Sequence, residues 1–230
     1  MTRRRKIALG CLGALVLLVS AMGGGAAYVT RPDPRFAHAI SIERDSVYQD
    51  PALLARAWAL PAARLYRPHF ESQGNGSFCG PTSVVDVVRS TGGELDQAHV
   101  LDGSGIRTWL GFLPGGITIE QVARLAQRRY PDRSVTVHRD LDLDALREIA
   151  RRADDPDLRF IANFHRGPLF ARGGGHHSPI GGYLEDEDLV FVLDVNHDYG
   201  PWLAHTERLL EAMNVIDPAT GDTRGVVAIE

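Results

Sequence analysis

The chain is organised around Gln73-Gly74-Asn75-Gly76-Ser77-Phe78-Cys79-Gly80-Pro81-Thr82-Ser83, where a loop rich in Gly, Asn and Ser changes into an apolar run. The change predicts a helix over about residues 81–90, because Pro suits the first turn of a helix, where its missing N–H would have no partner. Cys79 is then expected beside the free backbone N–H groups and the positive dipole end of that helix, a setting that favours the reactive thiolate. A buried, inert cysteine is the alternative, but the polar, glycine-rich approach argues against simple burial. Gln73, six residues before Cys79, could supply an amide donor to an oxyanion.

The first thirty residues have the pattern of a secretory signal. A basic cluster, Arg3-Arg4-Arg5-Lys6, precedes an apolar run and small residues that end at Ala27, a plausible last residue before cleavage. Residues 7–29 carry no charge and are long enough to span a bilayer, so a retained membrane anchor is the alternative. In both cases we expect the body to be exported, either periplasmic or anchored to the inner membrane and facing the periplasm.

The cysteine count supports a functional thiol. The sequence has two cysteines, and Cys11 lies inside the N-terminal apolar segment, so the body has a single thiol, Cys79, and no intramolecular disulfide. An unpaired cysteine in an exported protein calls for a reason, and catalysis is one.

Length and charge limit the classes of function. A chain of 230 residues can bury the core of one domain or of two tightly packed lobes. The net charge is −4, and the body without the N-terminal basic cluster has 21 basic against 29 acidic side chains. Such a surface is a poor match for nucleic acid, which needs clustered Lys and Arg.

The first half of the body has helical patterns. Asp50 and Pro51 are an N-cap and a first helical residue, after a connecting stretch over residues 31–49, and this helix is predicted to end near Pro61. Thr118 and Gln121 form a predicted capping box, and Asp142 caps another amphipathic stretch.

The second half has strand patterns. They cover residues 160–164, 178–183, 189–195 and 226–229, with a helix over residues 206–213 before the last of them. Helices first and strands afterwards, without regular alternation, predict an α+β fold rather than a doubly wound sheet.

A base for the cysteine is predicted in this strand-rich half. A cysteine nucleophile needs a base and an orienting partner, which usually come from distant parts of the chain. Glycine-rich sequence surrounds His176 and His177, and Asp194 closes an apolar strand. The alternatives are a satisfied loop pair or a metal site completed by Asp194 or His197. The chain has no His-Glu-x-x-His or paired-cysteine spacing to support a metal enzyme.

These residues resemble the catalytic domain of the phytochelatin synthase family. The resemblance runs over residues 50–230, and its motifs occur in order: Gln-x-x-x-x-x-Cys-Gly, Gly-Ile-Thr at a helix start, Gly-His-x-Ser-Pro-Ile-x-x-Tyr, Asp-Val at a strand end, and Ala-Met-Asn followed by Asp and Thr-Arg-Gly. It implies a papain-like fold, with a helical N-terminal lobe carrying the cysteine helix packed on an antiparallel-sheet lobe carrying His and Asp. With the N-terminal pattern described above, the predicted organisation is 1–30 as signal or anchor, 31–49 as linker and 50–230 as catalytic domain.

The resemblance implies a role for each matching residue. Cys79 is the nucleophile, His176 the base and Asp194 its orienter, with Gln73 in the oxyanion hole. His177 falls where the family commonly has an apolar residue, so no catalytic role is assigned to it. The resemblance further implies that the acyl site is lined by Asn163 and Gly175, and that the glutamyl α-amino and α-carboxylate groups are held by Asp217 and Arg224.

The implied activity is thiol-dependent acyl transfer on glutathione. Glycine leaves, a γ-glutamylcysteinyl thioester forms, and water or a second glutathione accepts the acyl group. No cofactor is expected for the first acylation, while a Cd²⁺ or Zn²⁺ thiolate could be the acceptor or an activator. A homodimer, and contact with the inner membrane if the N-terminal segment is retained, are compatible with this interpretation.

Two other functions stay open at this point. One is a papain-like peptidase of the bacteriocin-leader-processing type, which shares a Gln…Cys-Gly-Pro-Thr-Ser style of motif. The other is a non-catalytic envelope protein that binds thiols or metals, in which Cys79 would be unreactive.

Overall fold

A computed structural model describes residues 33–230. The predicted signal or anchor lies outside these residues. No helix within residues 33–230 combines the length and the apolar character needed to cross a bilayer.

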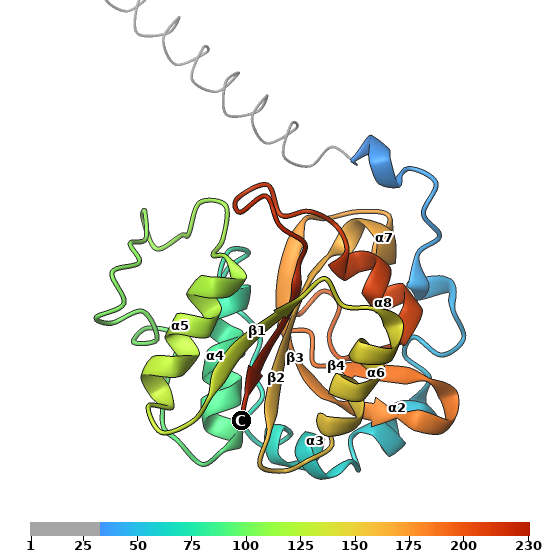
Figure 1. Cartoon of the computed structure of the whole chain (residues 1–230), viewed down its shortest axis with the longest axis horizontal. Helices are drawn as coiled ribbons and strands as arrows, with labels where there is room; N and C mark the ends of the chain where they lie inside the picture. Colours follow the sequence, from blue (N-terminus) through green and yellow to red (C-terminus); the bar gives the residue numbers. More distant parts are fainter. Residues whose placement is uncertain (1–32) are drawn as a thin grey trace, which may run out of the picture.

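A six-stranded antiparallel sheet forms the middle of the molecule (Figure 1). Its strands lie in the order β1-β6-β2-β3-β4-β5, so the last strand of the chain is inserted between two earlier ones. Val227 on the last strand pairs with both Val137 and Ile161. The strands are β1 (Val135–Arg139), β2 (Arg159–His165), β3 (Gly175–Leu184), β4 (Leu189–Val192), β5 (Trp202–His205) and β6 (Gly225–Ile229).

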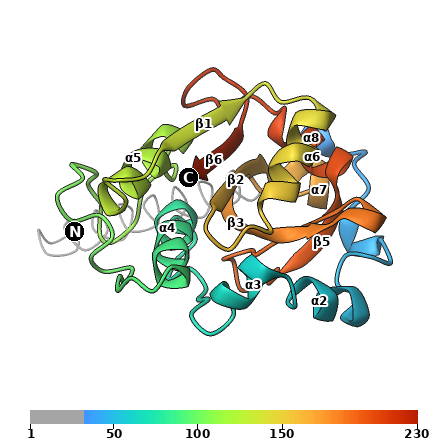
Figure 2. The same cartoon turned by 60° about the horizontal axis from the view of Figure 1, so that its bottom comes forward.

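Helices cover both faces of this sheet, as the turned view in Figure 2 shows. One face packs against α2 (Pro51–Ala57), α3 (Pro61–Tyr66), α4 (Cys79–Ser90) and α5 (Ile119–Arg129). The other packs against α6 (Leu143–Arg152), α7 (Arg166–Phe170) and α8 (Thr206–Met213). The predicted α+β class is confirmed, and so is the papain-like arrangement of a cysteine-bearing helix on an antiparallel sheet that carries His and Asp. The predicted division into a helical and a sheet lobe is incomplete, because three helices lie on the far face of the sheet.

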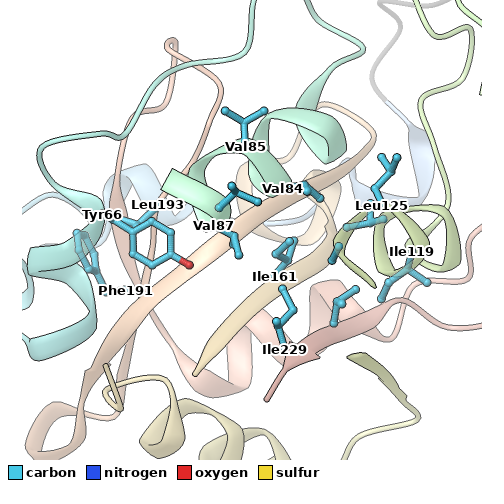
Figure 3. Packing of buried hydrophobic residues seen from close by; sticks show 14 of the residues in the cluster. Tyr66, Val84, Val85, Val87, Ile119, Leu125, Ile161, Phe191, Leu193 and Ile229 are labelled. Carbon is cyan, nitrogen blue, oxygen red and sulfur yellow. The ribbon is translucent and has the colours of Figure 1, made fainter. Parts of the chain in front are cut away.

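The core on the α4 side holds the cysteine helix against the sheet. Figure 3 shows Val84 and Val87 of α4 above Ile161 of β2 and Ile229 of β6, and all four are 0% exposed. Full burial of such an aliphatic side chain contributes about 1.5–3 kcal/mol. Packing of this kind fixes the position of α4, and therefore of Cys79, relative to β3.

Several elements differ from the sequence-based expectations. The helix predicted to end near Pro61 ends at Ala57, and Pro61 begins a second helix, α3, that the pattern missed. The predicted strand over residues 189–195 ends at Val192. The pattern missed β1, a half-exposed edge strand, as well as the four-residue β5 and the five-residue α7. Helix α8 and the Thr118–Gln121 capping box are confirmed.

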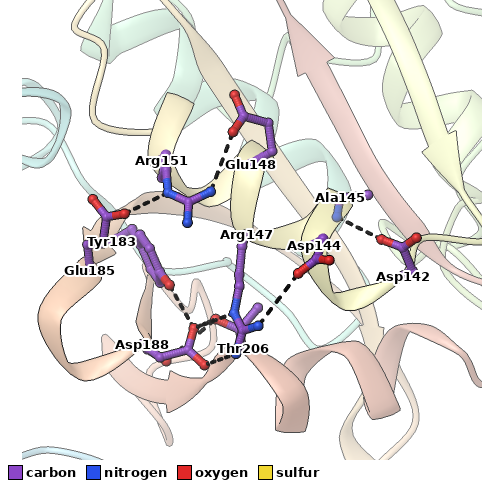
Figure 4. Close-up of polar contacts among 10 residues, drawn as sticks. All are labelled: Asp142, Asp144, Ala145, Arg147, Glu148, Arg151, Tyr183, Glu185, Asp188 and Thr206. Carbon is purple, nitrogen blue, oxygen red and sulfur yellow. Dashed lines mark hydrogen bonds and ion pairs between the residues drawn. The ribbon is translucent and has the colours of Figure 1, made fainter.

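A polar network joins α6 to the turn between β3 and β4 and to the start of α8 (Figure 4). The carboxylate of Asp188 accepts hydrogen bonds from Tyr183 Oη at 2.7 Å, Thr206 Oγ1 at 2.6 Å and Arg147 Nη2 at 2.7 Å. These donors hold the pKa of Asp188 well below its usual value, with Arg147 the largest cause, against a smaller effect of burial. The network ties α6, the turn between β3 and β4 and the start of α8 together.

Residues 33–49 contain two short 3-10 helices, Pro34–Phe36 and Ile42–Arg44. Ile42 and Tyr48 are buried in the core of the α7 and α8 face, and the ring of Phe36 lies 4.9 Å from that of His165. This stretch therefore packs against the body.

One side chain of the cysteine helix carries a buried carboxyl group. Asp86 is 1% exposed, its Oδ1 accepts the Glu71 N–H at 3.0 Å, and its Oδ2 has no partner in the described part of the chain. Burial raises the pKa of Asp86 to about 8, so the group is protonated at neutral pH.

We expect Asp86→Asn to change how stability depends on pH. Because the pKa of Asp86 is raised in the folded state above its ordinary value of 3.8, its contribution to stability is full below about pH 4 and is lost as pH rises towards 8. The amide keeps an acceptor for the Glu71 N–H and cannot ionise. As pH rises through that window, the free energy of unfolding of the variant should increase relative to that of wild type by up to about 1.4 kcal/mol per pH unit.

Urea unfolding between pH 4 and 8 measures this effect. The exposed Asp132→Asn is the matched control and should run parallel to wild type. If the free energy of unfolding of Asp86→Asn changed with pH in the same way as that of wild type, the assignment of a neutral carboxyl group to this position would be contradicted.

Candidate active site

The thiol lies at the start of the cysteine helix. Cys79 is the first residue of α4, so the helix begins two residues before the predicted start. Close packing explains the early start, because a Cβ on Gly80 would come within 2.8 Å of Ile117 and 2.9 Å of Val122. Glycine thus lets the first turn approach the loop before α5. Cys79 is buried, with 8% of its surface exposed.

Two imidazoles from β3 act on the sulfur, one by direct contact and one through its charge. His177 Nδ1 lies 3.9 Å from Cys79 Sγ. The neighbouring His176 is 5% exposed, and its Nε2 lies 2.9 Å from Asp194 Oδ1. That contact has the distance of an ion pair without the alignment of a hydrogen bond, which is common in catalytic sites without substrate.

Asp194 is held in place from several directions. It follows β4, is 0% exposed, and its Oδ1 accepts Arg166 Nη2 at 2.7 Å while its Oδ2 accepts Trp202 Nε1 at 2.9 Å. Burial alone would raise the pKa of Asp194, but the charges of His176 and Arg166 and the hydrogen bond from Arg166 hold it well below its usual value. The carboxylate is therefore ionised and fixed beside His176.

The electrostatics of the site favour a thiolate and an imidazolium. Burial acts to raise the pKa of the Cys79 thiol, but the charge of His176, with hydrogen bonding from His176 and His177, lowers it well below its usual value. Burial and Arg166 oppose protonation of His176, yet Asp194 and the sulfur raise its pKa. Each charge stabilises the other, which is the arrangement that activates a cysteine nucleophile.

A cavity of about 370 Å³ opens beside the sulfur. Its walls include Cys79, His177 and Gly175, together with the loop of Gly115, Gly116 and Ile117 and the segment of Asp217, Pro218, Ala219 and Arg224. Larger hollows occur elsewhere, for example near His69 and Arg129 at the other end of α4, but Cys79 lines none of them. The nucleophile and a cavity of substrate size therefore coincide here.

An ion pair lies in the wall opposite the helix. Arg224 Nη1 is 3.2 Å from Asp217 Oδ2, and the two side chains are 5% and 14% exposed. Burial lowers the pKa of Arg224, and Asp217 partly offsets this effect. The guanidinium lies against Gly175, where a Cβ would come within 2.5 Å of Nη1. Gly175 thus makes room for the arginine directly before His176.

Gln73 and Asn163 make local contacts. Gln73 Nε2 donates to the Asn75 carbonyl at 2.8 Å, just before the cysteine, and its backbone N–H donates to Val195 O at 2.7 Å. Asn163, whose role in lining the acyl site stays a prediction, lies on β2. It is fully buried, and its Nδ2 donates to the His176 carbonyl at 3.0 Å, so it anchors the strand that carries the base.

Comparison with known proteins places this site in a family. The family model described as phytochelatin synthase matches residues 112–226, half of the chain. The chain belongs to the phytochelatin synthase family. The matched region includes His176, Asp194, Asp217 and Arg224 and begins after Cys79, and in the folded chain Cys79 lines the same cavity as Asp217 and Arg224.

The curated relatives are named glutathione gamma-glutamylcysteinyltransferases. Glutathione gamma-glutamylcysteinyltransferase 1 of Triticum aestivum is 34% identical over 182 residues, which make up 70% of this chain and 34% of the relative. Glutathione gamma-glutamylcysteinyltransferase of Schizosaccharomyces pombe is 29% identical over 171 residues, 69% of this chain and 41% of the relative. The chain thus spans about a third to two fifths of the length of these relatives.

Two solved peptidase domains have a comparable outline. The peptidase domain of Streptococcus ComA superposes with a TM-score of 0.45 at 16% identity, covering 70% of this chain and 96% of that domain. A double glycine motif protease from an AMS/PCAT transporter has a TM-score of 0.44 at 11% identity, covering 68% of this chain and 86% of that domain.

Sequence reasoning on this phytochelatin synthase family member missed three side chains of the site. Arg166 and Trp202 hold Asp194, but neither belongs to a motif, and each lies in an element that the pattern missed. No catalytic role was assigned to His177 because the family commonly has an apolar residue at its position. That departure from the family pattern was the signal that could have identified it as part of the site. No cluster of three or more potential metal ligands occurs in residues 33–230, and His197 is exposed beside Asp198.

Proposed function

We propose that the protein cleaves the Cys–Gly peptide bond of glutathione through a thioester on Cys79. The γ-glutamylcysteinyl group then passes to water, or to a second glutathione to give a phytochelatin. The observation that carries the proposal is the presence in one cavity of an activated sulfur and the Asp217–Arg224 pair. The names of the curated relatives support the same chemistry.

In the acylation step the Cys79 thiolate attacks the carbonyl carbon of the cysteinyl residue. His176 donates its proton to the glycine nitrogen, the C–N bond breaks, and glycine leaves. The ionised Asp194 keeps the imidazole oriented and stabilises its charge. Gln73 has a second amide hydrogen besides the one bonded to Asn75, and this hydrogen is the proposed donor to the oxyanion.

The Asp217–Arg224 pair is proposed to hold the glutamyl end of the substrate. A γ-linked glutamyl group presents a free α-amino and a free α-carboxylate group, so it needs one anion and one cation. Arginine can bind the carboxylate through two parallel N–H donors. The ion pair already faces the cavity, so the substrate would join an existing charge arrangement rather than bury new unpaired charges.

Hydrolysis is the proposed main outcome, with transfer to a second glutathione slower. The residues after Asp194, Asn196-His197-Asp198-Tyr199-Gly200-Pro201, lack the basic residues expected to attract an anionic acceptor. No metal is proposed for the first acylation, while a Cd²⁺ or Zn²⁺ thiolate of glutathione is a proposed acceptor. We also propose that the body acts in the periplasm, either free or held at the inner membrane by residues 1–30.

Incubation of the purified protein with glutathione tests the proposal. We expect release of free glycine in the presence and absence of EDTA, and a mass increase of the intact protein by one γ-glutamylcysteinyl group after rapid acid quenching. The absence of both products would refute the proposal. The ratio of γ-glutamylcysteine to longer peptides then measures hydrolysis against transfer.

Arg224→Gln is expected to lower kcat/KM for glutathione by about 10²-fold, because a charged hydrogen-bonded contact contributes about 1.5–3 kcal/mol. The loss should be much smaller for a peptide that lacks the glutamyl end. The exposed Arg64→Gln is the matched control and should behave as wild type. A peptidase for α-linked peptides would not need Arg224, so unchanged kinetics in a folded Arg224→Gln variant would favour that alternative.

A further inference from the structure

The two histidines at the start of β3 meet different surroundings. Successive side chains of a strand point to opposite faces of the sheet. His176 pairs with Phe164 of β2, and their rings are 5.5 Å apart, whereas His177 pairs with Asn163. His176 contacts the Asp194 carboxylate, while His177 contacts the sulfur of Cys79 directly. The second histidine is therefore part of the nucleophile's environment.

The surroundings of His177 indicate which nitrogen carries the proton. The side chain is 3% exposed, and its Nε2 is buried with no hydrogen-bond partner within residues 33–230. A proton on Nε2 would be a buried donor without an acceptor, which is costly. A proton on Nδ1 finds the Cys79 sulfur 3.9 Å away. The less costly tautomer of His177 is therefore the one that donates to sulfur.

We propose that His177 is a second hydrogen-bond donor to Cys79 Sγ and that it acts mainly when the thioester breaks down. The inference rests on the proposed acyl transfer. Water adds to the thioester carbonyl and gives a proton to His176. The C–S bond of the tetrahedral intermediate then breaks, and its electron pair returns to sulfur. The resulting thiolate accepts a hydrogen bond from Nδ1–H of His177.

A donor on the sulfur affects the two half-reactions differently. A stabilised thiolate is a weaker nucleophile per molecule but a better leaving group. The larger thiolate fraction raises the rate of acylation and the weaker nucleophilicity of each thiolate lowers it, so the two effects partly cancel. Deacylation gains because the C–S bond breaks towards a stabilised sulfur. A family member that favours hydrolysis would benefit from such a donor.

Other charges near the sulfur must be held constant in any test. His176 and Asp194 lie on the β3 and β4 side, with Arg166 behind Asp194. Arg224 and Asp217 face the same cavity from the loop before β6. A substitution confined to His177 leaves all five in place.

The first test measures the pH dependence of Cys79 alkylation by iodoacetamide, which needs no substrate. His177→Phe should raise the apparent pKa of the thiol by about one unit, since a hydrogen bond to a charged group is worth about that much. His177→Asn should return it towards wild type, because the Asn amide nitrogen takes the place of Nδ1. His69→Phe, an exposed site away from the cavity, is the control and should not shift.

The outcomes are separable. An unchanged alkylation profile in a folded His177→Phe variant overturns the proposal. A His177→Asn variant that behaves like His177→Phe would assign the effect to packing and overturn it as well. Because alkylation does not involve glutathione, a failure of the proposed function leaves this measurement intact.

The second test follows the acyl-enzyme during a single turnover with glutathione. We expect His177→Phe to slow decay of the thioester about tenfold, so that the acylated protein accumulates, while the first release of glycine changes much less. Decay at the wild-type rate would overturn the assignment to deacylation.

Discussion

Cys79→Ala is expected to lower the rate of glycine release from glutathione by roughly 10⁴-fold or more, because the reaction then has no atom that can form the thioester. The remaining imidazoles and the binding pair could only orient water. No mass increase of the intact protein should follow incubation with glutathione. Cys79→Ser should be nearly as inactive, because a hydroxyl is far harder to ionise beside His176 than a thiol.

The fold should tolerate this change, which makes the result interpretable. Cys79 lies at the start of α4, and alanine is the best helix former. We expect thermal unfolding close to that of wild type. Equal glycine release by wild type and Cys79→Ala would show that the cysteine is not the nucleophile and would end the thioester mechanism.

Asp194→Ala is expected to remove most activity and also to destabilise the fold by about 3–5 kcal/mol. Its carboxylate is the partner of Arg166 at 2.7 Å, and that arginine is only 5% exposed. Without the carboxylate, a buried positive charge remains uncompensated, and the indole N–H of Trp202 loses its acceptor. Chemical denaturation at neutral pH measures the loss.

The effect should depend on pH with a definite sign. The pKa of Asp194 is lowered in the folded state, so its contribution is present above the unfolded-state pKa and is lost as pH falls through the folded value. The difference between wild type and Asp194→Ala should therefore shrink in strong acid. Asp198→Ala is the matched control, because the exposed His197–Asp198 pair should contribute less than about 1 kcal/mol. A loss for Asp194→Ala no larger than that of this control would contradict the structural role.

Elements with local determinants could be predicted from the sequence. Thr118 and Gln121 satisfy each other's backbone within one helical turn, and Asp142 caps the Ala145 N–H at 2.8 Å, so both helix starts were visible in the residue order. The same holds for α8 and for the long apolar strand β2. These signals need no partner from elsewhere in the chain.

Other elements have no local signal. Strand β1 has a mostly half-exposed pattern because it lies at the sheet edge, where only its pairing with β6 defines it. Helix α7 contains Gly167 and Pro168, which are poor helix formers, and packing rather than propensity holds it. Arg166 looked like any surface arginine until the fold buried it against Asp194.

The residue order was sufficient to indicate the α+β class, the family motifs and the identity of the candidate nucleophile, because each depends on neighbours along the chain. Only the folded molecule decided that His177 contacts the sulfur, that Arg166 and Trp202 hold Asp194, and that Asn163 anchors the strand that carries His176. Those facts depend on which faces of β2 and β3 meet α4 and α7. Strand register and burial set these faces, and both arise from contacts between residues far apart in the sequence.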